Sequence, residues 1–300
     1  MKTKILLIAL LPLFIACGSV KTTDKKGLEK SDNKVKGKRY ALVIGNANYK
    51  GDLNILQLKN PVNDARDMKS TLQQVGFKVI YRENAASREE MMDAVQIFRE
   101  KLHSGSVGVF YYAGHAVQVN GENYLIPTRS KLPSEKEVKY KTLSANYVLN
   151  QMEEAGNGSN IIILDACRDN PLPKETKTPR FAESRGLKKT GGAKNMRSIG
   201  TAGLAKMRSP KGSIIAFATA PDKPAMDGKG RNGTYTKHLL KAIKMPGLTV
   251  EAMFKQVREH VLRESNNQQT PWENSSFRGE FCFSGCQRQP KREIIMPLAN

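Results

Sequence analysis

The chain has 300 residues, of which 39% are hydrophobic and 7% aromatic, and its net charge is +21. This length fits one large α/β domain or two small ones, and the apolar content excludes a wholly disordered chain. Residues 1–39 and 173–211 together contribute +16 of the charge. Because these stretches have few aromatic residues among their charges, we expect solvated spacers; nucleic-acid binding is the less favoured alternative.

The first seventeen residues have the pattern of an export signal. A basic start precedes the apolar stretch Ile5–Ile15, which is too short to span a bilayer comfortably. The sequence Phe14-Ile15-Ala16-Cys17 resembles the bacterial lipobox, with Phe14 in the position where leucine is usual. The resemblance implies that Cys17 is lipidated and anchors an exported protein to a membrane. Ordinary signal cleavage near Ala16 is the alternative.

From residue 39 onward, predicted strands and helices alternate. The strands are predicted at 39–45, 77–81, 106–112, 161–164, 213–218 and 278–283. Helices are predicted to begin at Pro61 and at the capping box of Ser87 and Glu90, and to cover 144–155, 234–244 and 249–265. Asn120-Gly121 within 117–126 predicts a tight hairpin. The alternation predicts an α/β fold with a mostly parallel central sheet and helices on both faces.

Two reactive side chains follow two of the apolar strands. His115 comes just after the strand at 106–112, and Cys167 just after the strand at 161–164. In open α/β sheets, ligands bind outside the carboxyl ends of the strands, so both residues are expected at one edge of the sheet. An imidazole that takes the proton of a thiol leaves a nucleophilic thiolate, which predicts a Cys/His peptidase site. Each residue also has an alternative interpretation when it is considered alone. His115 would be a structural loop histidine, and Cys167 a small buried residue at a strand end.

The residues around this pair resemble a known family. Tyr111-Tyr112-Ala113-Gly114-His115 and Leu164-Asp165-Ala166-Cys167-Arg168 are similar to the two catalytic motifs of caspase-like cysteine peptidases, particularly of the bacterial orthocaspase type related to metacaspases and paracaspases. The similarity runs from about Arg39 to Phe283. Further matching blocks, in the same order, are Asn63-Asp64-Ala65, Asn123–Pro127, Ala218–Pro221, Gly228–Gly233 and Gln269–Pro271.

The resemblance implies roles for the site and a division of the chain. It implies catalysis by His115 and Cys167, with an oxyanion hole formed by the backbone N–H groups of Cys167 and Ala116. The family usually has glycine where Ala116 stands, and a methyl group there restricts φ. Its large-subunit region is expected at 39–172 and its small-subunit region at 213–285, separated by a basic linker (173–212). The export signal (1–17), a flexible basic tether (18–38) and a tail (286–300) complete the chain.

Three acidic residues match the primary specificity pocket of these relatives. Asp64 and Asp165 correspond to pocket aspartates of metacaspases and paracaspases, and Asp227 to a third acid of paracaspases. Carboxylates of this kind hold the guanidinium of an arginine, or a lysine less well, so the resemblance implies cleavage after basic residues. Each acid also has a structural alternative. Asp64 would interact with the positive end of its helix dipole, Asp165 would cap a strand-to-helix turn, and Asp227 would be a turn residue.

The sequence therefore predicts a cysteine endopeptidase that cleaves after Arg or Lys through a thioester acyl-enzyme. A catalytically weak, caspase-like scaffold is the alternative. The basic linker lies where family members are often cut, which predicts self-cleavage there; an uncut surface loop is the alternative. No cofactor or metal is expected: no EF-hand-type loop is present, and no histidine lies near Cys282 and Cys286, although calcium dependence occurs in metacaspases. Because an exported protein meets an oxidising environment, a disulfide between Cys282 and Cys286 is one possibility.

Overall fold

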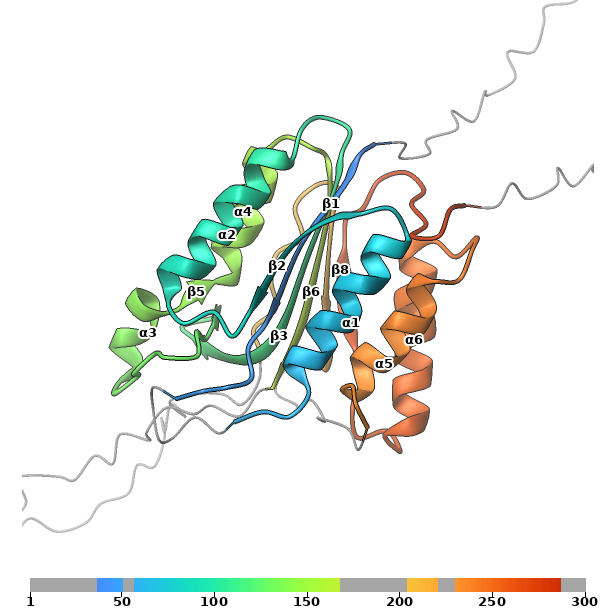
Figure 1. The fold of residues 1–300 in the computed structure, drawn as a ribbon. Coiled ribbons are helices and arrows are strands. Elements are labelled where there is room, and N and C mark those ends of the chain that lie inside the picture. The colour runs from blue at the N-terminus through green and yellow to red at the C-terminus, as the bar shows by residue number, and fades with distance from the viewer. Residues whose placement is uncertain (1–36, 51–56, 168–203, 221–229, 287–300) are drawn as a thin grey trace, which may run out of the picture. The chain divides into compact units, whose positions relative to one another are not determined.

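The computed structural model describes residues 37–50, 57–167, 204–220 and 230–286 (Figure 1). Six strands follow one another in the central sheet, in the order β2-β1-β3-β6-β7-β8. Neighbouring strands are parallel except at the edge, where β8 runs antiparallel to β7. In sheet order the strands are Lys78–Glu83 (β2), Arg39–Gly45 (β1), Val107–Val119 (β3), Ser159–Cys167 (β6), Ser213–Phe217 (β7) and Trp272–Ser275 (β8).

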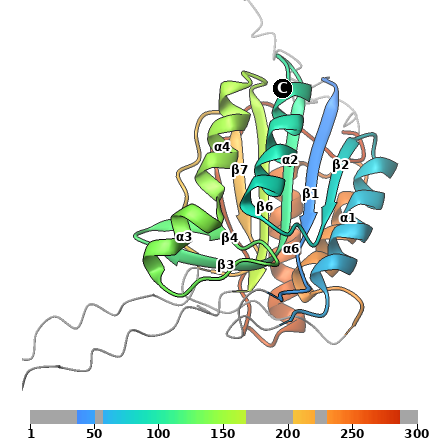
Figure 2. The ribbon, with the colours of Figure 1, turned by 60° about the vertical axis from the view of Figure 1, so that its left-hand side comes forward.

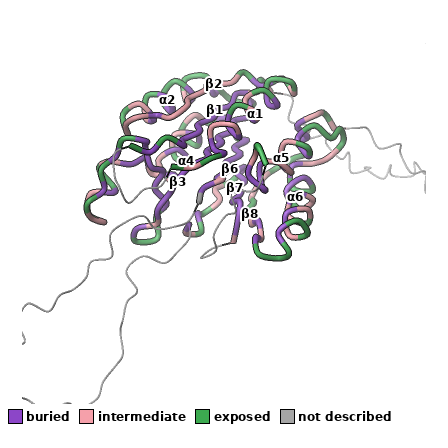
Figure 3. Tube along the Cα trace, turned by 60° about the horizontal axis from the view of Figure 1, so that its bottom comes forward, coloured by how far each residue is buried: buried purple, intermediate pink, exposed green. Residues whose placement is uncertain are grey.

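Helices cover both faces of this sheet, as the alternating pattern predicts. One face packs against α2 (Arg88–Lys101) and α4 (Ala145–Glu154), and the other against α1 (Pro61–Gln74), α5 (Thr234–Ile243) and α6 (Val250–Glu264) (Figure 1). The strands between these layers are largely buried (Figure 3). The mostly parallel α/β architecture expected from the sequence is confirmed.

The helix starts follow their sequence signals. Pro61 is the first residue of α1. At the start of α2 the hydroxyl of Ser87 accepts a hydrogen bond from the N–H of Glu90 at 3.2 Å. The carboxylate of Glu90 in turn accepts from the N–H of Ala86 at 2.7 Å, one residue before the cap. These two hydrogen bonds therefore satisfy one unpaired donor of the first turn and one donor just before the helix.

Strand β3 is longer than the sequence pattern predicts. It continues beyond the predicted end at residue 112, through His115, and then leaves the central sheet to pair antiparallel with β4 (Glu122–Leu125) (Figure 2). Strand β4 also pairs with β5 (Leu143–Ser144). Asn120 and Gly121 form the predicted tight turn, with φ of 52° and 81°. Helix α3 (Glu135–Lys141), which lies beside this arm, has no counterpart among the predicted elements.

The predicted last strand at 278–283 is wrong, because the edge strand is β8, a few residues earlier. Phe281, Cys282 and Phe283 are buried, but they fill the core as an irregular segment. The guanidinium of Arg39 holds this segment by donating to the carbonyl oxygen of Phe283 at 2.6 Å. Cys282 and Cys286 form a disulfide just beyond it.

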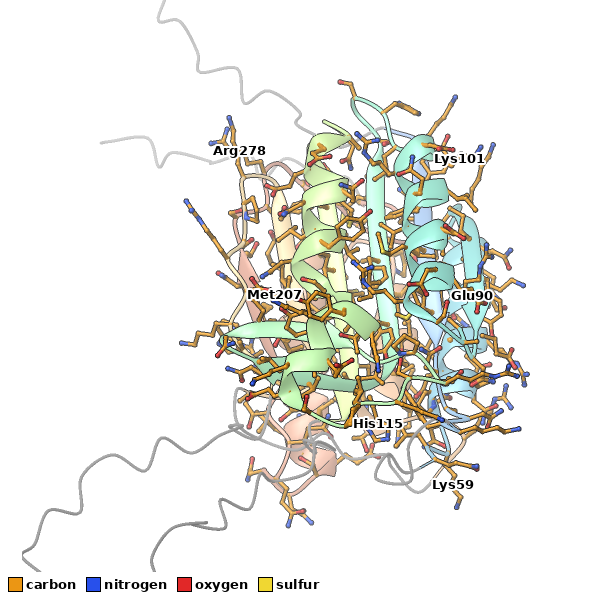
Figure 4. All side chains as sticks on the ribbon, turned by 90° about the vertical axis from the view of Figure 1, so that its left-hand side faces the viewer. Lys59, Glu90, Lys101, His115, Met207 and Arg278 are labelled. Carbon is orange, nitrogen blue, oxygen red and sulfur yellow. A yellow bond between two sulfur atoms is a disulfide. The ribbon has the colours of Figure 1, made fainter. Side chains whose placement is uncertain are left out.

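The end of the basic stretch packs against the core. Leu204 and Met207 are buried, and the side-chain amide of Asn123 in β4 pairs with both backbone groups of Ala205, at 2.6 and 2.8 Å. Met207 lies beside α4 in Figure 4. Among the described helices, none combines the length and the apolar composition needed to cross a membrane.

Candidate active site

His115 and Cys167 are directly paired across two neighbouring strands. In the parallel register of β3 and β6, the last pair is His115 with Cys167. Neighbouring strands lie about 4.8 Å apart, so the two main chains are adjacent. His115 lies at the same end of the sheet as Lys59, opposite Lys101 and Arg278 (Figure 4). The structure thus brings the two main chains together at the carboxyl end of the strands.

Two tyrosine hydroxyls hold the main chain of His115. Its N–H donates to the hydroxyl of Tyr49 at 2.7 Å, and its carbonyl oxygen accepts from the hydroxyl of Tyr112 at 2.7 Å. The Tyr49 ring also meets the imidazole edge-on, with ring centres 4.7 Å apart. His115 is 5% exposed. The imidazole is therefore oriented by packing on one side and by a fixed backbone beneath it.

Gly114 provides the room for this arrangement. Its φ is 154°, and a methyl group there would lie 2.7 Å from the hydroxyls of both Tyr112 and Tyr49. We expect Gly114→Ala to lower the free energy of unfolding by about 1–3 kcal/mol, because the site is already fully packed, and to displace the His115 backbone. Chemical denaturation measures the first effect, and an assay for the peptide hydrolysis expected from the sequence measures the second.

Gly121 offers a matched control for that substitution. It also has a positive φ, 81°, but no atom lies within 4 Å of the position that a methyl group would take. Gly121→Ala is therefore expected to cost conformational energy at the hairpin turn, while activity is retained. Equal losses of activity in the two variants would contradict a specific role for the close packing at Gly114.

Ala116, the expected oxyanion donor, follows at the point where β3 changes partner. His115 is the last residue paired with β6, and Ala116 is the first paired with β4, opposite Leu125. Among the described non-glycine residues, positive φ occurs only at Asn84, Asn120, Asn266 and Asn267. Alanine therefore fits this backbone without the strain that its methyl group would cause in a left-handed turn.

The carboxylates of Asp64 and Asp165 flank one glycine at the start of α5. Asp64, in the first turn of α1, accepts a hydrogen bond from the N–H of Gly233 at 3.1 Å. A methyl group on Gly233 would lie 3.3 Å from an oxygen of Asp64 and 3.7 Å from an oxygen of Asp165. Burial raises the pKa of Tyr111 well above its usual range, and the charges of Asp165 and Asp64 raise it further. The two acids, about a hundred residues apart in sequence, thus form one acidic cluster.

The loop before α5 is fixed by another acid, Asp67, which the sequence pattern does not single out. The carboxylate of Asp67, one turn after Asp64, accepts hydrogen bonds from two nitrogens of the Arg231 guanidinium at 2.9 and 3.0 Å. It also accepts one from the side-chain amide of Asn232 at 2.9 Å. The hydrogen bonds from Arg231 are the main reason that the pKa of Asp67 is lowered. Asp67 and Asp64 therefore hold consecutive residues of this loop against α1.

Several predicted site residues lie outside the described part of the chain. They are Cys17, Asp227 and the thiol group of Cys167. Among the described residues, a group of three metal-ligating side chains occurs only at Glu280, Cys282 and Cys286, near the end of the described part of the chain. Both sulfurs of that group form the disulfide, so they are not available as thiolate ligands.

Comparison with known proteins shows which family has this arrangement. The model of the caspase domain family matches residues 38–282. The chain belongs to this family of cysteine peptidases. A stretch of 130 residues is 33% identical to human mucosa-associated lymphoid tissue lymphoma translocation protein 1 and 32% identical to its mouse homolog. The stretch covers 43% of this chain and 15% of each relative.

Several residues that shape this caspase domain carry no chemical signature in the sequence. Tyr49, Asp67 and Thr236 lie near the site because of the fold alone. Tyr112 and Gly114 are adjacent to the histidine in the matched motif, which is the signal that could have identified them. The acids Asp64 and Asp165 were predicted, and the structure brings them together.

Proposed function

We propose that the protein is a cysteine endopeptidase in which Cys167 is the nucleophile and His115 the general base. The observation that carries the proposal is the pairing of these two residues at the carboxyl ends of β3 and β6. Glycine at position 114, and two tyrosine hydroxyls on the His115 main chain, support a histidine that is held in a defined place. A general base must be positioned within hydrogen-bonding reach of the proton it removes.

In this mechanism the imidazole of His115 takes the proton of the Cys167 thiol, and the thiolate attacks the carbonyl carbon of the scissile peptide bond. The N–H groups of Cys167 and Ala116 would stabilise the negative charge that develops on the carbonyl oxygen. His115 then gives its proton to the leaving amine, and the acyl group stays on sulfur as a thioester. A water molecule, deprotonated by His115, hydrolyses the thioester and regenerates the thiol.

We further propose that Asp64 and Asp165 bind the basic side chain that precedes the cleaved bond, with Asp227 as a third acid. The convergence of the first two carboxylates on Gly233 supports this role. A planar guanidinium pairs with two fixed carboxylates through several charge-assisted hydrogen bonds, whereas an ammonium acts as a point charge. The pocket therefore favours Arg over Lys.

The test is a panel of fluorogenic peptides that differ only in the residue before the cleaved bond: Arg, Lys, Asp or Leu. We expect turnover with Arg and Lys only. An irreversible peptidyl ketone with Arg in the same position is expected to label the protein at Cys167, as located by mass spectrometry. Preference for Asp would overturn the specificity assignment. If the protein shows no turnover and is not labelled, the peptidase proposal is overturned and a non-catalytic scaffold is favoured.

We also propose that the enzyme cleaves its own basic linker. Residues 173–211 carry eleven Lys and Arg residues, each of which supplies a bond of the proposed specificity. Cuts are expected before Leu204, because Leu204 and Met207 are buried and Ala205 is hydrogen-bonded to Asn123. Mass spectrometry of the purified protein tests this, with Cys167→Ala as the control. Equal fragmentation of the wild type and the control would reject self-cleavage.

The lipobox-like sequence leads to a proposal about location: Cys17 carries a lipid anchor, and the exported catalytic domain is tethered through residues 18–38. Multiple acyl chains bind a bilayer stably, whereas a single chain binds marginally. Cys17→Ser is expected to move the protein from the membrane fraction of cells to the soluble fraction. An unchanged distribution after high-salt washing would contradict lipid anchoring.

A further inference from the structure

A chain of hydroxyl groups leads from the interior of the sheet to Asp165. The hydroxyl oxygens of Tyr111 in β3 and Thr236 in α5 are 2.6 Å apart. The hydroxyl of Thr236 donates to a carboxylate oxygen of Asp165 at 2.6 Å. Tyr111 and Thr236 are both fully buried, while Asp165 is partly exposed. The chain thus begins in the core and ends at a partly exposed acid, which is one of the two assigned above to the proposed binding pocket.

The direction of these hydrogen bonds follows from the chemistry of the groups. An ionised carboxylate only accepts hydrogen bonds, so the hydroxyl of Thr236 donates its one hydrogen bond to Asp165. The oxygen of Thr236 is then an acceptor for Tyr111, which must be the donor. Both hydroxyl dipoles therefore point toward the carboxylate, and successive hydrogen bonds of this kind strengthen one another in a buried environment. Tyr111 remains a donor because burial and the nearby carboxylates favour its protonated form, raising its pKa.

The same short segment holds both acids of the pocket. Gly233, the residue before α5, binds Asp64 through its backbone N–H, and Thr236, three residues later, binds Asp165 through its side chain. The loop that precedes Gly233 is fixed to α1 by the ion pair of Arg231 with Asp67. The relative position of the two carboxylates is therefore set by the start of α5.

We propose that Thr236, supported by Tyr111, is a positioning residue that fixes the Asp165 carboxylate for bidentate binding of an arginine side chain, and so sets the preference for Arg over Lys. This inference rests on the proposed function and extends it to two residues that do not contact the substrate. A guanidinium needs carboxylate oxygens in a defined plane, whereas an ammonium tolerates their rotation. Release of Asp165 therefore weakens binding of Arg more than binding of Lys.

The test compares three variants with the wild type: Thr236→Val, which removes the hydroxyl and keeps the shape, Thr236→Ser, which keeps the hydroxyl, and Tyr111→Phe. For Arg peptides, Thr236→Val is expected to lower kcat/KM by roughly tenfold to a hundredfold, as for the loss of a hydrogen bond to a charged group. The loss is expected in KM, with kcat changed by less than about threefold, because the interaction is made in the ground state as well. The ratio of Arg to Lys turnover falls with it.

The two other variants distinguish positioning from general packing. Thr236→Ser is expected to restore most of the Arg preference, and Tyr111→Phe to show a smaller loss in the same direction. A second measurement does not need turnover: in the Cys167→Ala background, calorimetry is expected to show that Thr236→Val weakens binding of a peptide ending in Arg. If Thr236→Val does not fold, Tyr111→Phe decides by the same two measurements.

The possible results separate this inference from the proposed function. A wild type that cleaves after Arg, with unchanged KM and Arg to Lys ratio in Thr236→Val, overturns the role of Thr236 and leaves the peptidase intact. Equal losses for Arg and Lys in all three variants would also overturn it, since they indicate a packing effect. A wild type that hydrolyses neither peptide overturns both.

Discussion

Cys167→Ala is expected to lower kcat for Arg peptides by on the order of 10⁵-fold, because it removes the only atom that forms the covalent intermediate. His115→Ala is expected to cause a comparable loss, since in the proposed mechanism that imidazole forms the thiolate. The two residues act as a unit, so the double variant is expected to be no slower than either single variant. Steady-state kinetics at known concentrations of folded protein measure all three values.

The stability of these variants serves as a control. His115 is nearly buried beside Tyr49, so its replacement is also expected to lower the free energy of unfolding; chemical denaturation separates this effect from catalysis. A Cys167→Ala variant that keeps more than about one hundredth of the wild-type kcat would exclude Cys167 as nucleophile. Losses in the two single variants that multiply in the double variant would show that the residues act independently, against the proposed dyad.

Asp165→Asn is expected to lower kcat/KM for Arg peptides roughly a hundredfold, or about 3 kcal/mol, because the substituted amide no longer pairs with a guanidinium charge. The variant keeps the shape of the side chain and an oxygen that accepts from Thr236. Peptides with a neutral residue in that position, cleaved slowly if at all, are expected to show no comparable loss. The measurement is the substrate panel described above.

Asp93→Asn is the matched control for this charge change. Asp93 is exposed on α2, which covers the opposite face of the sheet from the acid pair. The Asp93→Asn substitution changes the net charge by the same amount as Asp165→Asn. Any effect of net charge on the long-range steering of cationic peptides is therefore the same in both variants. Equal losses in the two variants would assign the effect to the overall field and contradict the pocket.

Much of the fold follows from patterns of local sequence. The buried parallel strands are continuous apolar runs, and Pro61, Ser87 and Asn120-Gly121 mark element boundaries that the structure has. The prediction failed at the sheet edge. β8 is the polar segment Trp-Glu-Asn-Ser, stabilised by pairing with β7, while the apolar Phe-Cys-Phe run fills the core without pairing. Burial alone does not distinguish a strand from a packed irregular segment.

Only part of the candidate site could be predicted, because local sequence does not specify tertiary packing. His115, Cys167, Asp64 and Asp165 have reactive groups at strand or helix ends, so residue type and position together single them out. Thr236 is an ordinary residue in the first turn of a helix, and its bond to Asp165 spans 71 positions of sequence. Tyr111 is likewise an apolar-looking member of a buried strand. Such contacts depend on how α5 docks on β6, which no local pattern specifies.

The unbroken course of β3 has a consequence for how this family member tolerates insertions and deletions. Side chains alternate between the two faces of a strand, so removing or adding one residue between Val107 and His115 would turn the imidazole toward the opposite helical layer. The number of residues between the start of β3 and His115 is thus fixed by geometry. Farther along, at the hairpin tip of Asn120 and Gly121, added residues would extend into open space and leave His115 in place.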